Sequence, residues 1–102
     1  MGSFKLTQDA QKDLIEIRNY TLKKWGKAQS LNYISKLRDH LSLLSSKPQI
    51  AKPCPDIYEN AFRSAYESHV IYFVVVKDQI VVFAVLHKRM VPNNHLSDRK
   101  HI

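Results

Sequence analysis

Residues 69–89 read HVIYFVVVKDQIVVFAVLHKR, two long apolar runs separated by a short polar turn. The runs, His69 to Val76 and Ile80 to Leu86, are rich in Val, Ile, Phe and Tyr, which favour β-strands. The intervening Lys77-Asp78-Gln79 is typical of a hairpin turn. Because both runs contain few polar positions, we expect both faces of this hairpin to be covered. The second run ends in the cationic cluster His87-Lys88-Arg89.

The chain has 102 residues, a length that favours one domain with one sheet and one helical layer. Its 16 Lys and Arg outnumber its 9 Asp and Glu, which gives a net charge of +7. Such a charge favours an acidic partner: a nucleic acid, an acidic protein or an anionic surface. No stretch reaches the roughly 20 apolar residues of a membrane span, and no signal-peptide pattern opens the chain. Together with the lone Cys54, this predicts a cytoplasmic protein with no membrane partner.

Two helices are predicted before the hairpin. Thr7 can cap a first helix whose apolar positions recur every three or four residues, at Ala10, Leu14, Ile17, Thr21 and Trp25. Gly26 interrupts this periodicity, and a second one begins at Ala28 or Leu31 and runs to Leu44. We therefore expect an α-helical hairpin over about residues 8–45.

The remaining segments complete an α+β order. A short strand, Phe4-Lys5-Leu6, precedes the helices, and the proline-rich Ser45 to Pro55 is expected to lack regular structure. Ile57 to Ala65 is predicted to form the first strand of a three-stranded antiparallel β-meander over about residues 57–90. Pro92-Asn93-Asn94 is expected to end the sheet, and residues 91–102 to form a polar tail with Leu96 as its apolar anchor. The helical hairpin should pack on one face of this antiparallel sheet.

Local signatures are spread over almost the whole chain. They comprise Ala10 and Asp13-Leu14; Tyr20-Thr21 followed by Trp25-Gly26-Lys27; Pro48; Phe62-Arg63; Ser68-His69-Val70-Ile71-Tyr72; and Leu86-His87-Lys88-Arg89-Met90. With the order of elements, this combination resembles the ParE branch of the RelE/ParE toxin superfamily. The resemblance implies a RelE/ParE-like fold and a type II toxin. Such a toxin is neutralised by a cognate acidic antitoxin, ParD-like or other, and when free it inhibits growth by poisoning DNA gyrase.

The main alternative is the RelE branch, whose members cut messenger RNA on the ribosome. A ribonuclease needs a base, an acid and converging cationic side chains. In the RelE pattern an Arg lies in the strand that here reads His69 to Phe73, and this strand contains no Arg or Lys. The sequence therefore favours a non-enzymatic ParE-type inhibitor over a ribosome-dependent endoribonuclease. A toxin homologue with a different or lost target is the third possibility.

Two groups of residues are candidate contacts for the target or the antitoxin. The first group is Arg89 with Lys88 and His87, where a rigid strand ends. The alternative interpretation is that these charges only make the end of the strand soluble, and that His87 forms a hydrogen bond into the core. The second is the basic turn between the helices, with Lys23, Lys24 and Lys27 around Trp25. We interpret Trp25 mainly as the last position of the apolar stripe, with an exposed interface anchor as the alternative. Direct contact of either group with nucleic acid is left open.

Other reactive residue types give weaker predictions. His69 is read as a structural residue rather than a general base, and Arg63 as a partner of Glu59 or Glu67. Nothing near Cys54 suggests a lowered thiol pKa. The spacing of His95 and His101 does not place them on one face, so no metal or cofactor is expected. Arg99 and Lys100 are expected to belong to a flexible tail, and Arg89 is therefore the preferred contact residue.

Overall fold

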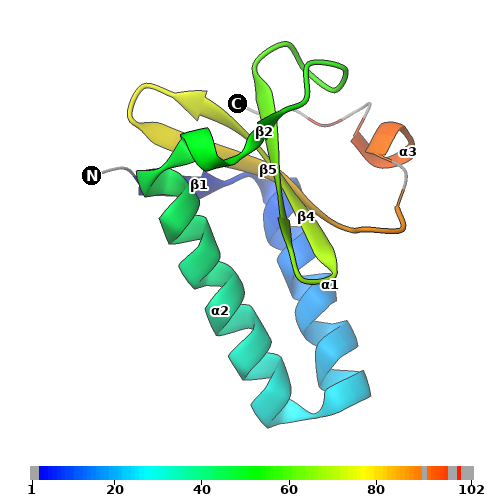
Figure 1. Ribbon diagram of the computed structural model, residues 1–102. Helices are drawn as coiled ribbons and strands as arrows, with labels where there is room; N and C mark the ends of the chain where they lie inside the picture. Colours follow the sequence, from blue (N-terminus) through cyan, green and yellow to red (C-terminus); the bar gives the residue numbers. More distant parts are fainter. Residues whose placement is uncertain (1–2, 91, 97–98, 100–102) are drawn as a thin grey trace.

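A computed structural model describes residues 3–90, 92–96 and 99 (Figure 1). Its sheet has five strands in the order β1-β5-β4-β3-β2. The strands are β1 (Ser3–Leu6), β2 (Lys52–Pro53), β3 (Ala61–Tyr66), β4 (His69–Val76) and β5 (Gln79–His87). The helices are α1 (Gln8–Trp25), α2 (Lys27–Ser46) and α3 (Pro92–Leu96), with one 3-10 turn, η1 (Pro48–Ile50). The fold is α+β, as the sequence predicts.

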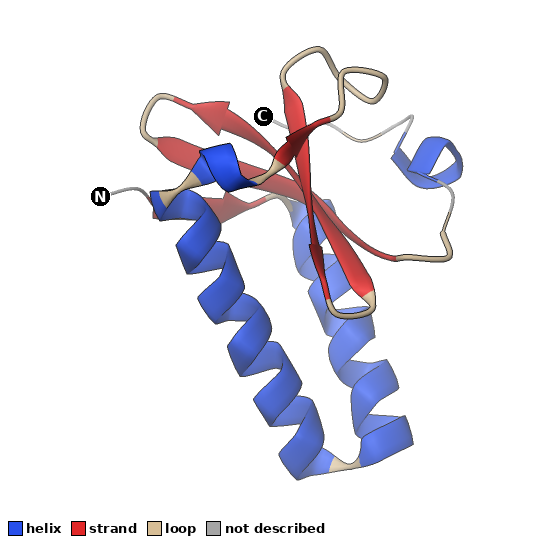
Figure 2. Ribbon diagram, in the orientation of Figure 1, coloured by secondary structure: helices blue, strands red, loops and turns tan. Residues whose placement is uncertain are grey.

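The helical hairpin forms for the local reasons that the sequence indicates. The Thr7 hydroxyl accepts a hydrogen bond from the Ala10 N–H at 3.2 Å and so caps α1. Gly26 joins the two helices with φ +91°, a conformation that favours glycine. Figure 2 shows that the far end of this hairpin extends beyond the sheet. Leu31, which we predicted to be on the buried stripe, is 60% exposed, because the buried face of α2 runs through the neighbouring Ser30, which packs on α1 and is 2% exposed.

The sheet is mixed rather than purely antiparallel. β3, β4 and β5 form the predicted antiparallel meander. β1, in contrast, pairs in parallel with β5, and the whole helical hairpin and meander separate the two in sequence. Parallel neighbours need such a long crossover connection, whereas antiparallel ones do not. The prediction that the sheet is antiparallel is therefore wrong for the N-terminal strand.

The segments flanking the meander are more ordered than predicted. Within the proline-rich stretch, Pro48 begins η1 and Pro53 ends β2, so the expectation that this stretch lacks regular structure is wrong. Proline is tolerated in both places because neither a helix start nor an edge strand needs its N–H. β3 begins at Ala61 instead of Ile57, since turns occupy the preceding residues. α3 occupies part of the expected tail, and its Leu96 is an anchor, 2% exposed.

Both faces of the central hairpin are covered, as its composition indicates. Side chains of Ile71, Phe73 and Val82 pack against buried leucines of α2 and the stripe of α1. On the opposite face, Tyr72 and Phe83 pack with a second cluster that includes Leu96 and Cys54. α3 and the loop after β2 cover this second face, and Leu96 packs there in one cluster with Phe83 and Leu86 of β5.

Candidate functional site

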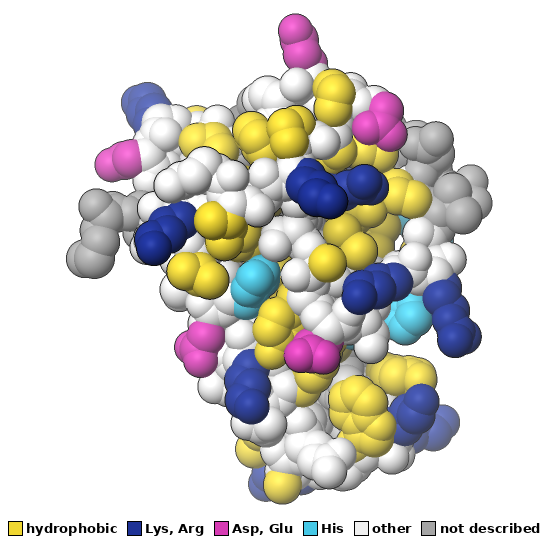
Figure 3. All heavy atoms as spheres, viewed as in Figure 1, with side chains coloured by type: hydrophobic (Ala, Val, Ile, Leu, Met, Phe, Trp, Pro, Cys, Tyr) yellow, Lys and Arg dark blue, Asp and Glu magenta, His cyan; other side chains and the backbone are white. Residues whose placement is uncertain are grey.

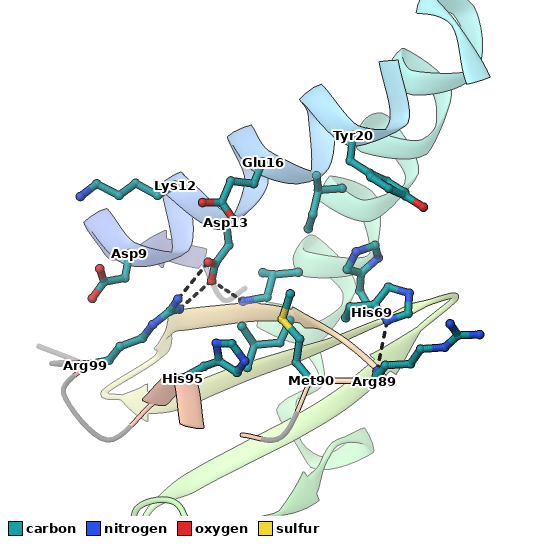
Figure 4. A pocket seen from close by; sticks show the side chains of 14 residues that line it. Asp9, Lys12, Asp13, Glu16, Tyr20, His69, Arg89, Met90, His95 and Arg99 are labelled. Atoms are coloured by element: carbon teal, nitrogen blue, oxygen red, sulfur yellow. Dashed lines mark hydrogen bonds and ion pairs between the residues drawn. The ribbon is translucent and has the colours of Figure 1, made fainter. Parts of the chain in front are cut away.

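A groove of about 670 Å³ lies between α1 and the outer edge of β5 (Figure 4). The wall formed by α1 carries Asp9, Lys12, Asp13, Glu16, Ile17 and Tyr20. The sheet contributes His69, Val85, Leu86 and His87. The segment after β5 contributes Arg89, Met90, His95 and Arg99. We call this depression the α1–β5 groove.

The groove exists because β1 covers only part of β5. The register of β1 on β5 ends at Leu6 opposite Val82, where the Thr7 N–H donates to the Val82 carbonyl at 3.0 Å before the chain enters α1. The alternation of an antiparallel ladder points the backbone groups of Val85 and His87 away from β4. Among the described residues, the Val85 carbonyl and the His87 N–H have no hydrogen-bond partner. The rest of β5 is therefore an open strand edge along the groove.

The ion pair of Asp13 and Arg99 binds the backbone at the start of this open edge. The Val85 N–H donates to Asp13 Oδ2 at 2.9 Å. Arg99 donates to both carboxylate oxygens of Asp13, at 2.6 and 3.0 Å, and its Nη1 also donates to the Phe83 carbonyl at 3.0 Å. The hydrogen bond with Asp13 raises the pKa of Arg99. The pair thus replaces the missing strand partner at Phe83 and Val85.

Sequence reasoning missed the role of both members of this pair. Asp13 stands three residues after Ala10 and four before Ile17, so it lies on the buried stripe of α1 and is 7% exposed. A carboxylate at such a position needs a charged or hydrogen-bonding partner. The position of Asp13 on the apolar stripe could therefore have predicted a buried partner from the sequence. Arg99 was expected to be flexible, but it is the partner. The Tyr58 hydroxyl also donates to the Leu96 and Arg99 carbonyls and so holds the same segment.

Arg89 and His87 line the α1–β5 groove. The Arg89 N–H donates to His87 Nδ1 at 3.1 Å, which fixes the turn after β5. The Arg89 side chain is exposed, and among the described residues it forms no ion pair. Figure 4 shows it at the end of the groove opposite Asp9 and Arg99. Asp13 is paired with Arg99, so Asp9 and Glu16 outnumber Lys12 on the α1 wall. The groove therefore has a small excess of negative charge along α1 and a positive charge where β5 ends.

His69 closes the floor of this basic end. It is 8% exposed, its Nδ1 is 2.7 Å from the Tyr33 hydroxyl, and its ring meets the edge of His87 at 5.5 Å between centroids. Burial, with a smaller effect of His87, lowers the pKa of His69 to about 4. His69 is consequently neutral near pH 7 and bonded to α2, which agrees with a structural residue.

Lys88 points away from the groove. It borders a second depression, of about 370 Å³, on the sheet face opposite the long helices. We call it the basic depression; its lining residues are Ile50, Lys52, Arg63, Ser64, Ala65, Val70 and Lys88. Among the described residues, Arg63 forms no ion pair, so its predicted pairing with Glu59 or Glu67 is wrong. The candidates His87, Lys88 and Arg89 therefore belong to two surfaces instead of one.

The remaining candidates lie at the hairpin tip, residues 23–27. Lys23, Lys24 and Lys27 are all exposed there. Trp25 is 43% exposed and meets Tyr33 edge-on at 5.9 Å, so it both packs on α2 and faces solvent. From residue 17 to residue 38 the chain has six Lys or Arg and no Asp or Glu. Figure 3 shows such cationic and hydrophobic side chains at the lower end of the molecule.

Other reactive groups do not assemble a catalytic or metal centre in the described part of the chain. Burial raises the pKa of the Cys54 thiol, which disfavours the reactive thiolate. Among the described residues, no three His, Cys, Asp or Glu side chains are grouped as metal ligands. His95 is exposed, and His101 lies outside the described residues. No described helix is long and apolar enough to cross a membrane.

Comparisons with known proteins agree on one family. Residues 4–92 match the profile of the family described as "ParE toxin of type II toxin-antitoxin system, parDE". The chain is 30% identical to a "Toxin ParE" of Escherichia coli, over 97% of each protein. It is 27% identical to "Toxin ParE1" of Caulobacter vibrioides, over 94% of this chain and 99% of that one. A chain in the structure "Chromosomal ParDE TA system from P. aeruginosa" shares the fold, with a TM-score of 0.73, 18% identity, and coverage of 85% of this chain and 96% of that one.

Proposed function

Because this chain belongs to the ParE toxin family of type II toxin–antitoxin systems, we propose that a cognate antitoxin neutralises it through the α1–β5 groove. We also propose that the free toxin acts in the cytoplasm and inhibits growth by poisoning DNA gyrase. The observation that carries the antitoxin site is the open edge of β5 along the groove. An extended peptide can satisfy the free Val85 carbonyl and His87 N–H by adding a strand there.

The charges of the groove define the antitoxin segment that would fit. Asp9 and Glu16 outnumber Lys12 on the α1 side, and Arg89 lies where β5 ends. A complementary segment presents basic side chains to α1 and acidic ones to Arg89, with apolar side chains over Ile17 and Met90. A uniformly acidic segment would meet repulsion along α1. The net charge of +7 still favours an acidic antitoxin for long-range attraction.

Hydrogen exchange on the toxin–antitoxin complex tests this site. The toxin is co-expressed with its cognate antitoxin, isolated by gel filtration, and compared with free toxin. We expect the His87 amide to become strongly protected in the complex, because strand addition gives it an acceptor. The Lys5 amide, on β1 at a distance from the open edge, serves as the control. A complex that leaves the exchange of His87 unchanged contradicts the proposed site.

The arrangement of cationic and titratable side chains supports a non-enzymatic mechanism. Ribonuclease chemistry needs a proton acceptor and donor beside converging cations. The cations of the basic depression, Lys52, Arg63 and Lys88, have no His, Asp or Glu in its lining. His69 is neutral, bonded to Tyr33, and lies on the α1–β5 groove instead. That groove also holds His87, His95 and Glu16, but its cations do not converge, because Arg99 is bonded to Asp13 and Arg89 lies at the opposite end. We therefore propose inhibition by binding.

A paired assay separates gyrase poisoning from the ribonuclease alternative. Purified toxin should lower gyrase supercoiling of a plasmid and cause linear DNA to accumulate, and prior addition of antitoxin should prevent both effects. Messenger RNA incubated with toxin and ribosomes should remain intact by primer extension. Codon-periodic cleavage with gyrase unaffected would establish the ribonuclease instead, and no effect in either assay would indicate a different target.

A further inference from the structure

The basic depression gathers three cationic side chains that form no ion pair with any described residue. Lys52, Arg63 and Lys88 line it from β2, β3 and the segment after β5. No carboxylate lines it, and among the described residues none of the three cations is in an ion pair. Asp56 lies near Tyr72, as Arg63 does, without pairing with Arg63. Figure 3 shows Lys and Arg side chains on the face that carries these strands.

Two of these cations are placed directly against each other. Lys52 on β2 is the cross-strand partner of Arg63 on β3. Like charges in directly opposed positions destabilise a sheet, whereas an acidic side chain at either position would stabilise it. The repulsion between the two cations is offset when an anion binds between them. The depression therefore has the chemistry of an anion-binding site.

The spacing of the cations indicates an extended polyanion rather than one small ion. Arg63 stands opposite Tyr72, and the Lys88 N–H donates to the carbonyl of Ser68, which lies four residues before Tyr72, just ahead of β4. Strand geometry then separates the backbones of Lys88 and Arg63 by roughly 16 Å. Lys88 and the Lys52–Arg63 pair can consequently contact different phosphates of one strand.

The backbone of β2 disfavours a protein segment at this place. β2 is an edge strand of two residues, and one of them, Pro53, has no N–H to donate. A peptide would find few main-chain partners there, in contrast to the open edge of β5. Recognition at the depression must therefore use side-chain charge, which is how proteins contact phosphates without reading sequence.

We propose that the basic depression binds the phosphate backbone of a nucleic acid, independently of base sequence, through Lys52, Arg63 and Lys88. This site lies on the opposite face of the sheet from the long helices and is separate from the α1–β5 groove. It does not rest on the proposed function, since a toxin with any target could carry it. If gyrase is the target, such a site would add a direct contact with the DNA that gyrase holds.

Fluorescence anisotropy with a short labelled DNA duplex and the full purified chain tests the proposal. Three phosphate contacts predict a loss of about 40-fold in affinity between about 50 and 200 mM salt. Each of Lys52→Gln, Arg63→Gln and Lys88→Gln should weaken binding several-fold and lower the salt slope by about 0.9. The matched control is Lys5→Gln, an exposed cation on β1 at the opposite edge of the sheet, which should leave both quantities unchanged.

A thermal melt of each variant provides the second readout. Arg63→Gln removes like-charge repulsion, so its melting temperature should stay the same or rise, whereas a purely structural Arg63 would lower it. Lys88 lies outside the strands, so Lys88→Gln tests binding even if a strand variant folds poorly. Three results would overturn the proposal: no binding at low salt, equal weakening by Lys5→Gln, or displacement of DNA by polyglutamate as readily as by unlabelled duplex. The last would identify the site as one for an acidic protein.

Discussion

The guanidinium of Arg99 donates to both oxygens of the Asp13 carboxylate, which lies 86 positions earlier in the chain. Through this pair, Arg99 is bound to the first helix and to the edge of β5. Both groups are largely withdrawn from water, since their side chains are 16% and 9% exposed. Loss of either partner would leave the other charge buried without compensation, and this is the costly outcome for such pairs.

Asp13→Asn should destabilise the protein by about 3 kcal/mol, because the amide can still accept from Val85 but no longer balances Arg99. For a domain of this size the melting temperature should fall by more than about 10 °C. Circular dichroism melts measure this change. Asp9→Asn removes the same charge from the same helix and should cost no more than about 1 kcal/mol. Equal losses in both variants would show that the pair adds nothing specific.

Deleting residues 99–102 should have nearly the same effect as Asp13→Asn. The deletion leaves both Asp13 and the Phe83 carbonyl without Arg99, which the sequence had assigned to a flexible tail. Deleting only residues 100–102 keeps Arg99 and serves as the control. If the two truncated proteins melt at the same temperature, Arg99 does not hold the chain end.

Stability should fall as the pH is lowered from about 6.5 to about 4, in part because of His69. The unfolded chain takes up a proton at His69 in this window and the folded protein does not, so the unfolded state binds more protons. The loss attributable to His69 is no more than about 3 kcal/mol and is absent above this range. Burial lowers the pKa of His40 as well, so His40 also makes the protein less stable as the pH falls.

Urea unfolding of the wild type and of His69→Gln, repeated across this pH range, isolates the contribution of His69. Glutamine can keep a hydrogen bond with Tyr33 but does not titrate. The pH dependence should therefore be shallower in His69→Gln. Parallel curves for the two proteins would show that His69 titrates alike in the folded and unfolded states.

Arg89→Ala should weaken antitoxin binding or toxicity while changing stability by about 0.5 kcal/mol or less. The side chain is exposed, lines the α1–β5 groove, and forms no ion pair within the described residues. Calorimetric titration with antitoxin and a growth assay measure the two effects, and Lys5→Ala provides the matched loss of charge. Unfolding of Arg89→Ala would instead make Arg89 a structural residue and shift attention to the hairpin tip.

The hairpin tip can be monitored through Trp25, the one tryptophan of the chain. Its side chain is half exposed, so a partner bound at Lys23, Lys24 and Lys27 should change its environment. With a fluorinated tryptophan at this position, fluorine NMR should show a shift when gyrase binds and none when antitoxin fills the groove. A shift with antitoxin alone would place the tip within the antitoxin interface.

Local patterns in the sequence were sufficient to locate the helical hairpin and the β-meander. Residues three or four apart share a helix face and alternate residues share a strand face, so the stripe from Ala10 to Thr21 and the runs around Val74 and Val82 could be read directly. Gly26 and Leu96 were identified for equally local reasons, an interruption of the helical periodicity and an isolated apolar anchor. Leu31 and Trp25, which were predicted to lie on these stripes, are 60% and 43% exposed, and Ser30 occupies the buried face of α2 in place of Leu31.

The composition of each surface was decided by the tertiary structure. Lys88 and Arg89 are adjacent in sequence, yet they border different depressions on different sides of the sheet. Asp13 meets Arg99, and Lys52 meets Arg63, only because parallel pairing of β1 and the short strand β2 bring distant segments together. Periodicity reports which face a residue occupies, but it carries no information on which distant residue faces it. Which distant residues meet is set by the tertiary packing of the whole chain.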